Sequence, residues 1–136
     1  MQYSDHITEP QVKVVDSATD CPELDIVDGQ GTVKVLFWPG NGSLKRSMHY
    51  HQLQDESSLF PLQHPFDCVY YVLKGAGTIK DGLTGEQQSL VEGSIIHIDK
   101  HESYTITAGN DGIDFVGGPC PPDDKLYEKI KSQGEH

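Results

Sequence analysis

Short segments rich in Val, Ile, Tyr and Thr recur along the chain between clusters of Gly, Asn and Asp. Several of these segments alternate apolar and polar residues with a period of two, which is typical of a strand with one buried face. Before the C-terminal tail, almost no stretch shows the 3.6-residue spacing of a helix. The pattern predicts about nine strands, which are residues 11–15, 32–38, 47–53, 68–73, 77–81, 86–91, 94–98, 103–107 and 112–116.

The clusters between these segments have the composition of tight turns. They include PGNGS at 39–43, KDGLTGE at 80–86 and AGNDG at 108–112. Gly, Asn and Asp tolerate the positive φ angles that such turns require. Closely spaced strands joined in this way favour an all-β antiparallel sandwich or barrel.

The tail has a different pattern. Prolines in GGPCPP, residues 117–122, cannot continue a strand ladder. Asp123 or Asp124 could then cap a helix. Apolar residues follow at helical spacing, namely Leu126, Tyr127 and Ile130. We therefore expect a short C-terminal helix.

Length and charge limit the possible partners. The 136 residues suit one domain spanning 1–136, with polar ends at 1–10 and 131–136 that we expect to be loosely held. The formal charge of −11 repels nucleic acid and anionic membranes. No apolar run approaches the roughly 20 residues that span a bilayer, and the start lacks a secretory signal pattern. These features predict a soluble cytoplasmic protein with no nucleic-acid or membrane partner.

The three cysteines, Cys21, Cys68 and Cys120, are far apart and lack CxxC spacing. Such a set suggests neither a disulfide framework nor a thiolate zinc site. Reduced thiols are the expectation.

Two stretches resemble the paired sequence motifs of the cupin superfamily. They are PLQHPFDCVYYVLKGAGTI at 61–79 and LVEGSIIHIDKHESYTI at 90–106. The resemblance covers about residues 33–122 and implies a jelly-roll β-barrel whose hollow holds a small organic molecule. Within the superfamily, IIHIDKHESYTITA at 95–108 is similar to a stretch of ectoine synthase.

Cupins usually bind a divalent metal through three histidines and a glutamate. The resemblance places these four positions on Leu62, His64, Cys68 and Tyr104, so only His64 keeps the usual residue. A thiolate can bind zinc or iron and a phenolate can bind ferric iron, but Cys and Tyr lose a proton less readily than Glu. The resemblance therefore implies a degenerate metal motif.

A second pair of histidines offers a displaced metal site. His49 and His51 lie two apart in a predicted strand and so share one face. If residues 47–53 and 60–65 are neighbouring strands, these imidazoles could approach His64 and hold Zn, Fe, Mn or Ni at a non-standard site. The alternative is a solvated histidine pair and no metal cofactor.

Alternation also predicts which side chains share the interior. Tyr70 lies on the face of Cys68, and the motif brings His64 and Tyr104 to the same level. Imidazole and phenol groups suit acid–base chemistry, so the candidate catalytic residues are His64, Tyr104, Tyr70 and His51. The candidate pocket-lining residues are Leu62, Cys68, Ile96 and Phe115. Cys68 could equally be a small buried apolar residue.

Two other histidines are weaker candidates. His97 has the opposite parity to Ile96 and Ile98 and should face outward, and His101 lies in an expected turn. The favoured function is a small cupin enzyme of lyase, cyclase, dehydratase or isomerase type. The alternative is a metal-free small-molecule binding or sensor protein. Because exposed edge strands invite pairing, we expect a homodimer.

Overall fold

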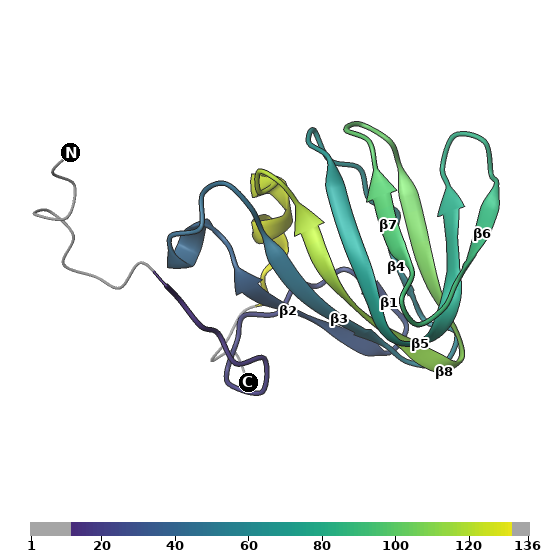
Figure 1. Cartoon of the computed structure of the whole chain (residues 1–136), viewed down its shortest axis with the longest axis horizontal. Coiled ribbons are helices and arrows are strands. Elements are labelled where there is room, and N and C mark those ends of the chain that lie inside the picture. The colour runs from purple at the N-terminus through teal and green to yellow at the C-terminus, as the bar shows by residue number, and fades with distance from the viewer. Residues whose placement is uncertain (1–11, 132–136) are drawn as a thin grey trace, which may run out of the picture.

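The fold is a single eight-stranded sheet that curls into a nearly closed barrel (Figure 1). The computed structural model describes residues 12–131. Its strands are β1 (Val27–Asp28), β2 (Gly31–Phe37), β3 (Met48–Leu53), β4 (Ser58–Leu59), β5 (Cys68–Asp81), β6 (Gln87–Leu90), β7 (Ile95–Ile98) and β8 (Tyr104–Pro119). The described residues also form the 3₁₀ helices η2 (Pro39–Asn41) and η3 (Asp124–Lys129).

The long strands β5 and β8 form the central antiparallel pair of the sheet. β8 also pairs with β3 and β4, and β3 pairs with β2. β5 in turn carries β6 and β7. All the described pairs are antiparallel, so the predicted all-β class is confirmed.

Strands β5 and β8 are longer than predicted, because each joins two segments that we expected to be separate. The pairing register moves from Gly75–Ile113 directly to Gly77–Ala108, so residues 109–112 bulge from the ladder. Gly112 has a φ of 83°, and a Cβ there would lie 2.8 Å from the carbonyl oxygen of Leu53. The expected AGNDG turn therefore bends β8 rather than ending it.

One predicted strand is absent, and one condition set for the displaced metal site is not met. Residues 12–15 form no strand, since Val12 and Val14 are exposed and no partner strand lies beside them; residue 11 falls outside the described residues. Residues 60–65 do not pair with β3, whose neighbours are β2 and β8. Only Leu62 in that segment bridges to another strand, at Tyr104.

The predicted C-terminal helix is present as the 3₁₀ helix η3. Asp123 caps it, because its Oδ1 accepts a hydrogen bond from the Lys125 N–H at 3.1 Å. Buried Leu126 and a bridge between Ile130 and Leu24 hold the helix to the barrel. The expected loose ends lie outside the described residues, except Lys131, whose N–H donates to the Glu23 carbonyl at 2.8 Å.

Alternation decides what fills the barrel. Cys68, Tyr70 and Val72 of β5 point inward, whereas Val69 and Tyr71 point outward, as the period of two predicts. The interior also contains polar side chains that are almost fully buried, namely His49, His51, His64 and Asp123. Among residues 12–131, no helix is long and apolar enough to span a bilayer.

Candidate functional site

A chain of four hydrogen-bonded side chains crosses the barrel interior. The His64 Nε2 atom lies 2.7 Å from the Tyr104 hydroxyl, which lies 2.5 Å from the Tyr70 hydroxyl. At the other end of the chain, His64 Nδ1 lies 2.8 Å from Asp123 Oδ2. Every member of the chain is at most 5% exposed. The polar groups are thus fixed relative to one another before any ligand arrives.

Different parts of the fold supply these groups. Tyr70 is on β5 and Tyr104 begins β8, whereas His64 lies in the loop before β5. The backbone bridge between Leu62 and Tyr104 holds that loop beside β8, with reciprocal N–H to carbonyl distances of 2.9 Å. Asp123 comes from the N-terminus of η3. The docked C-terminal segment therefore completes the chain.

Burial favours the neutral forms of the phenols, the thiol and the imidazole in this interior. Desolvation raises the pKa of Tyr70 and Tyr104 well above the usual phenol value, and it raises the pKa of Cys68 to about 12. Burial also lowers the pKa of His64, against the opposing effect of its contact with Asp123. At neutral pH, the interior contains a thiol and two phenols that keep their protons, beside an imidazole that can accept one.

His49 and His51 are also almost fully buried, on the inward face of β3. Burial lowers the pKa of His49 to about 3 and that of His51 to about 4, so both are neutral. His51 Nδ1 lies 3.0 Å from the Phe115 carbonyl oxygen, which can only accept. His51 therefore carries its proton on Nδ1. His49 Nε2 lies 2.9 Å from the Tyr127 hydroxyl.

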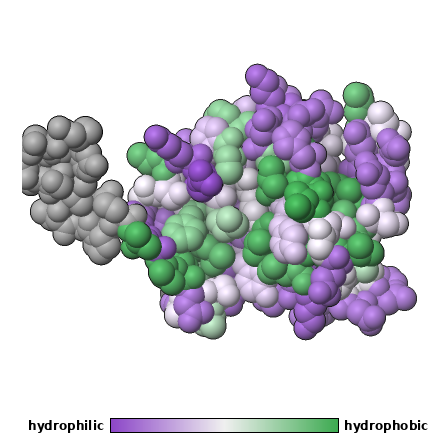
Figure 2. All heavy atoms as spheres, in the orientation of Figure 1, coloured by the Kyte–Doolittle hydropathy of each residue, from purple (hydrophilic) through white to green (hydrophobic). Residues whose placement is uncertain are grey.

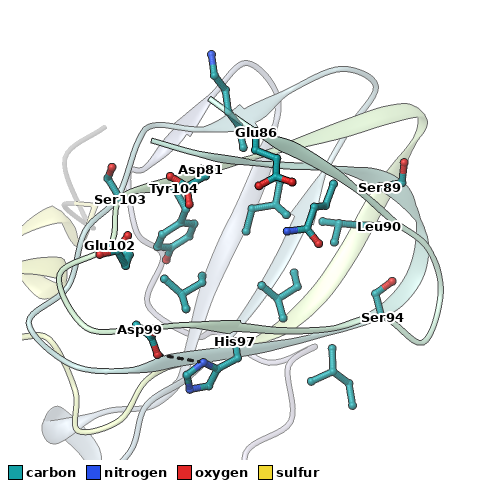
Figure 3. A pocket seen from close by; sticks show the side chains of 16 residues that line it. Asp81, Glu86, Ser89, Leu90, Ser94, His97, Asp99, Glu102, Ser103 and Tyr104 are labelled. Atoms are coloured by element: carbon teal, nitrogen blue, oxygen red, sulfur yellow. Dashed lines mark ion pairs between the residues drawn. The ribbon is translucent and has the colours of Figure 1, made fainter. Parts of the chain in front are cut away.

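A groove of about 510 Å³ opens beside this network, between β7 and the hairpin of β5 and β6. Figure 3 shows Tyr104 at one end with Ser103 and Glu102, and Leu90 at the other end with Ser89 and Ser94. The apolar side chains that line the groove include Ile79, Ile96 and Ile98. Tyr104 is the only member of the buried chain that also lines this groove.

The groove has an acidic rim. Four acids line it against a single lysine, Lys80; the acids are Asp81, Glu86, Asp99 and Glu102. The negative potential of such a rim attracts cations and repels anions. Its hydroxyl and amide groups, from Ser89, Ser94, Ser103 and Gln88, offer hydrogen bonds to a neutral polar molecule.

A second groove of about 650 Å³ lies at the hairpin ends near Gln54, Lys74 and Asp111. No histidine, tyrosine or cysteine lines it. The first groove is therefore the stronger candidate for chemistry.

The predicted site residues separate into three groups. His64, Tyr104 and Tyr70 are brought together as one hydrogen-bonded chain. His51 contacts this chain only through the ring of Tyr70, with a centroid distance of 5.1 Å. Of the predicted lining residues, Ile96 lines the first groove, whereas Cys68 and Phe115 are fully buried and Leu62 is half-buried outside both grooves.

The three interior histidines do not converge on one point. A metal site needs at least three His, Cys, Asp or Glu side chains with their ligand atoms close together. Within residues 12–131, one such group has its ligand atoms within 4.8 Å of one another, and it consists of Asp67, His97 and Asp99. That group could hold a metal ion, but it is exposed on the outer face, where parity places His97. The three-histidine metal site stays a prediction.

The residues at the usual cupin metal positions do not fit the usual ion. Both ring nitrogens of His64 already have hydrogen-bond partners. Cys68 and Tyr104 are held in their protonated forms, because burial raises the pKa of each. Leu62 offers no donor atom. Metal binding here would require two deprotonations and loss of the His64 contacts.

Sequence reasoning missed two residues of this interior. It identified Asp123 only as a helix cap and Tyr127 only as part of an apolar helix face, whereas they contact His64 and His49 respectively. No local pattern carries this information, because each contact spans at least 59 residues of sequence.

Comparison with solved structures shows what kind of barrel this is. A predicted oxalate decarboxylase from Thermotoga maritima is 23% identical, with a TM-score of 0.68 over 80% of this chain and 99% of that one. A cupin-like protein from Thermotoga maritima is 13% identical, with a TM-score of 0.67 over 87% of this chain and 100% of that one.

The polyketide cyclase RemF from Streptomyces resistomycificus is 19% identical, with a TM-score of 0.67 over 92% of this chain and 89% of that one. No family model and no curated protein matches the sequence. The narrower likeness to ectoine synthase stays a prediction. At these identities the comparisons establish the architecture, and they agree with the barrel in Figure 1: this chain has the jelly-roll fold of the cupin superfamily.

Proposed function

We propose that this protein is an enzyme that moves a proton on a small neutral or cationic organic molecule bound in the groove beside Tyr104. The observation that carries the proposal is the position of Tyr104, which lines the groove and is also hydrogen-bonded to His64 inside the barrel. Proton transfer of this kind underlies lyase, cyclase, dehydratase and isomerase reactions.

The proposed step is a relay through one phenol. The Tyr104 oxygen takes a proton from the substrate while the Tyr104 hydroxyl proton passes to His64 Nε2, along the 2.7 Å contact. The substrate is left with the electron pair of the broken bond, and His64 becomes an imidazolium. Reversal of the relay returns the proton to another substrate atom, or to a leaving group.

Tyr70 has a supporting role in this proposal. Its hydroxyl is 2.5 Å from the Tyr104 oxygen and can stabilise negative charge that develops there during the transfer. His51 packs against the Tyr70 ring, and it stacks on Phe115 with a centroid distance of 4.2 Å. We assign His51 to holding Tyr70 in place rather than to contact with the substrate.

The acidic rim favours one class of substrate. Oxalate, the compound after which the predicted decarboxylase from Thermotoga maritima is named, is a dianion at neutral pH and would meet four carboxylates. A neutral oxygen-rich molecule, of the kind suggested by the polyketide cyclase neighbour, meets hydroxyl donors and isoleucine side chains instead. The proposed substrate is therefore uncharged or cationic.

The test is turnover of a compound panel that contains oxalate, neutral polyketide-like β-polyketones and small amines. We expect wild-type turnover of a neutral or cationic member and a loss of about 10²- to 10⁴-fold in kcat for Tyr104→Phe, as for removal of a general acid–base group. The matched control is Tyr50→Phe, which removes a phenol hydroxyl bonded to Asp114 on the outer face of β3.

Equal turnover by wild type and Tyr104→Phe would reject the relay. Saturable binding in the groove without turnover of any member would favour the alternative, a metal-free binding protein. Chemical-shift changes at Ile96 and Ile98, which line the groove, would report that binding.

We also propose a homodimer formed through the outer face of the sheet. Large apolar side chains are exposed there on β5 and β7, namely Val69, Tyr71, Leu73 and Ile95. Tyr71 pairs with Ile95 on one side and with Val116 on the other, which makes an apolar row across three strands. Figure 2 shows apolar surface gathered on the visible face of the barrel. A second copy is the proposed occupant.

The unpaired state of Cys21, Cys68 and Cys120 supports a cytoplasmic location, where thiols stay reduced. That location and the single domain over 1–136 remain proposals.

A further inference from the structure

The proposed relay requires a bare lone pair on His64 Nε2, and this requirement leads to Asp123. A neutral imidazole carries one proton, on either nitrogen, and the two nitrogens of His64 face different partners. Nε2 faces the Tyr104 hydroxyl, which can donate or accept. Nδ1 faces Asp123 Oδ2, a carboxylate oxygen that can only accept. The carboxylate therefore selects the form with the proton on Nδ1.

This selection propagates along the chain. With its lone pair on Nε2, His64 accepts the Tyr104 hydroxyl proton. Because Tyr104 has only that one proton to donate, its oxygen accepts from Tyr70 across 2.5 Å. All donors then point toward Asp123, which stands at the end of the chain.

We propose that Asp123 is a positioning residue that fixes the tautomer of His64 and so the direction of the whole hydrogen-bond chain. It also stabilises the imidazolium that forms when His64 takes the Tyr104 proton. This inference rests on the proposed function for its catalytic consequence, but the tautomer itself can be measured without any substrate.

The two oxygens of Asp123 have separate partners, which makes the inference testable. Oδ1 accepts the Lys125 N–H and caps η3, whereas Oδ2 contacts His64. In Asp123→Asn the side-chain oxygen can keep the cap, and Asn is as good a cap as Asp. The amide NH₂ then faces His64 Nδ1 and requires a bare nitrogen there. The proton moves to Nε2, and Tyr104 can no longer donate to it.

The experiment is long-range ¹H–¹⁵N spectroscopy of the histidine side chains in the full chain, which distinguishes protonated from bare ring nitrogens. Wild type should show His64 with a protonated Nδ1 and a bare Nε2, and Asp123→Asn should show the reverse. The control is Asp124→Asn, which removes the same charge from the exposed neighbouring residue and should leave His64 unchanged.

Asp123→Ser provides a second variant, because Ser also caps helices but is too short to replace the carboxylate at His64. We expect a lower Nδ1–H population in it. An unchanged His64 tautomer in both folded variants would overturn the inference.

Activity gives an independent readout. On any substrate found in the panel, Asp123→Asn should lower kcat by about 10²- to 10⁴-fold, the range for groups that hold an acid–base histidine in its working form. A reversed tautomer with unchanged kcat would reject the proposed relay while leaving the positioning role intact. An unchanged tautomer would reject the positioning role whatever the kinetics show.

Discussion

At the scale of single residues, burial decides which side chains are reactive. Strand parity predicted that Cys68 and Tyr70 face inward and that His97 faces outward, and the structure confirms all three directions. Parity could not show that Asp123 reaches His64, since that contact depends on where the C-terminal segment docks. The side chains on regular strands were therefore predictable, whereas the partners from loops and the tail were not.

The cysteines provide a residue-scale prediction. Cys68 is fully buried with its pKa raised to about 12, and Cys120 is exposed. Because the thiolate is the reactive form, iodoacetamide at pH 8 should modify Cys120 in the folded protein long before Cys68. Mass spectrometry of timed digests measures both rates. Comparable rates in the native protein would contradict the buried position of Cys68.

At the scale of elements, close approach between strands shapes the site. Gly117 lies in β8 opposite Tyr70 of β5 and His49 of β3. Its φ is 144°, and a Cβ there would come 2.0 Å from the carbonyl oxygen of Val69. The alternation of apolar and polar residues located the strands. In the sequence, however, a glycine that lets β3, β5 and β8 lie close together looks the same as a glycine in a turn. For the same reason, β5 and β8 were each predicted as two strands.

Gly117→Ala should therefore be strongly destabilising, by more than the roughly 1–2 kcal/mol that a left-handed backbone conformation costs an L-residue. Gly93→Ala is the matched control, because Gly93 has a φ of 93° but nothing within 4 Å of its added Cβ. Urea unfolding of both variants gives the two free energies of unfolding. Equal losses would mean that the strands can separate at Gly117 without cost.

At the scale of the whole molecule, the buried histidines couple stability to pH. The folded-state pKa values of His49 and His51 are about 3 and 4, below the usual value of 6.5. Below pH 6.5 the unfolded chain therefore binds protons that the folded chain does not. Each histidine then costs about 1.4 kcal/mol of stability per pH unit. His51 continues to do so down to its folded pKa, near pH 4, and His49 down to near pH 3.

The free energy of unfolding should thus fall steeply from pH 6.5 to pH 4. The slope of the free energy of unfolding against pH reports how many more protons the unfolded chain binds. In His51→Gln this number should be smaller by about one, whatever the absolute stability of the variant. The exposed His101→Asn should keep the wild-type slope. Denaturant titrations at several pH values measure this slope for each variant. A wild-type profile that is flat over this window would show that these imidazoles are not buried in the neutral form.

The proposed homodimer is the other prediction at this scale. Ile95→Asp and Tyr71→Asp place a charge in the apolar row on the outer face and should convert a dimer to a monomer. Val91→Asp is a control, because Val91 is also exposed but lies outside this row, after β6. Sedimentation equilibrium gives the mass of each. A wild-type monomer at 100 µM, or variants that remain dimeric, would reject this interface.

The central claim is that His64 and Tyr104 transfer a proton through their own hydrogen bond, and chelation tests it most directly. Turnover of the compound identified in the panel would be measured on purified protein before and after exhaustive treatment with a chelator, alongside Tyr104→Phe. The account predicts that chelated wild type keeps its full kcat and that Tyr104→Phe loses about 10²-fold or more. Loss of turnover on chelation with recovery on adding a divalent metal, and full activity in reloaded Tyr104→Phe, would contradict it.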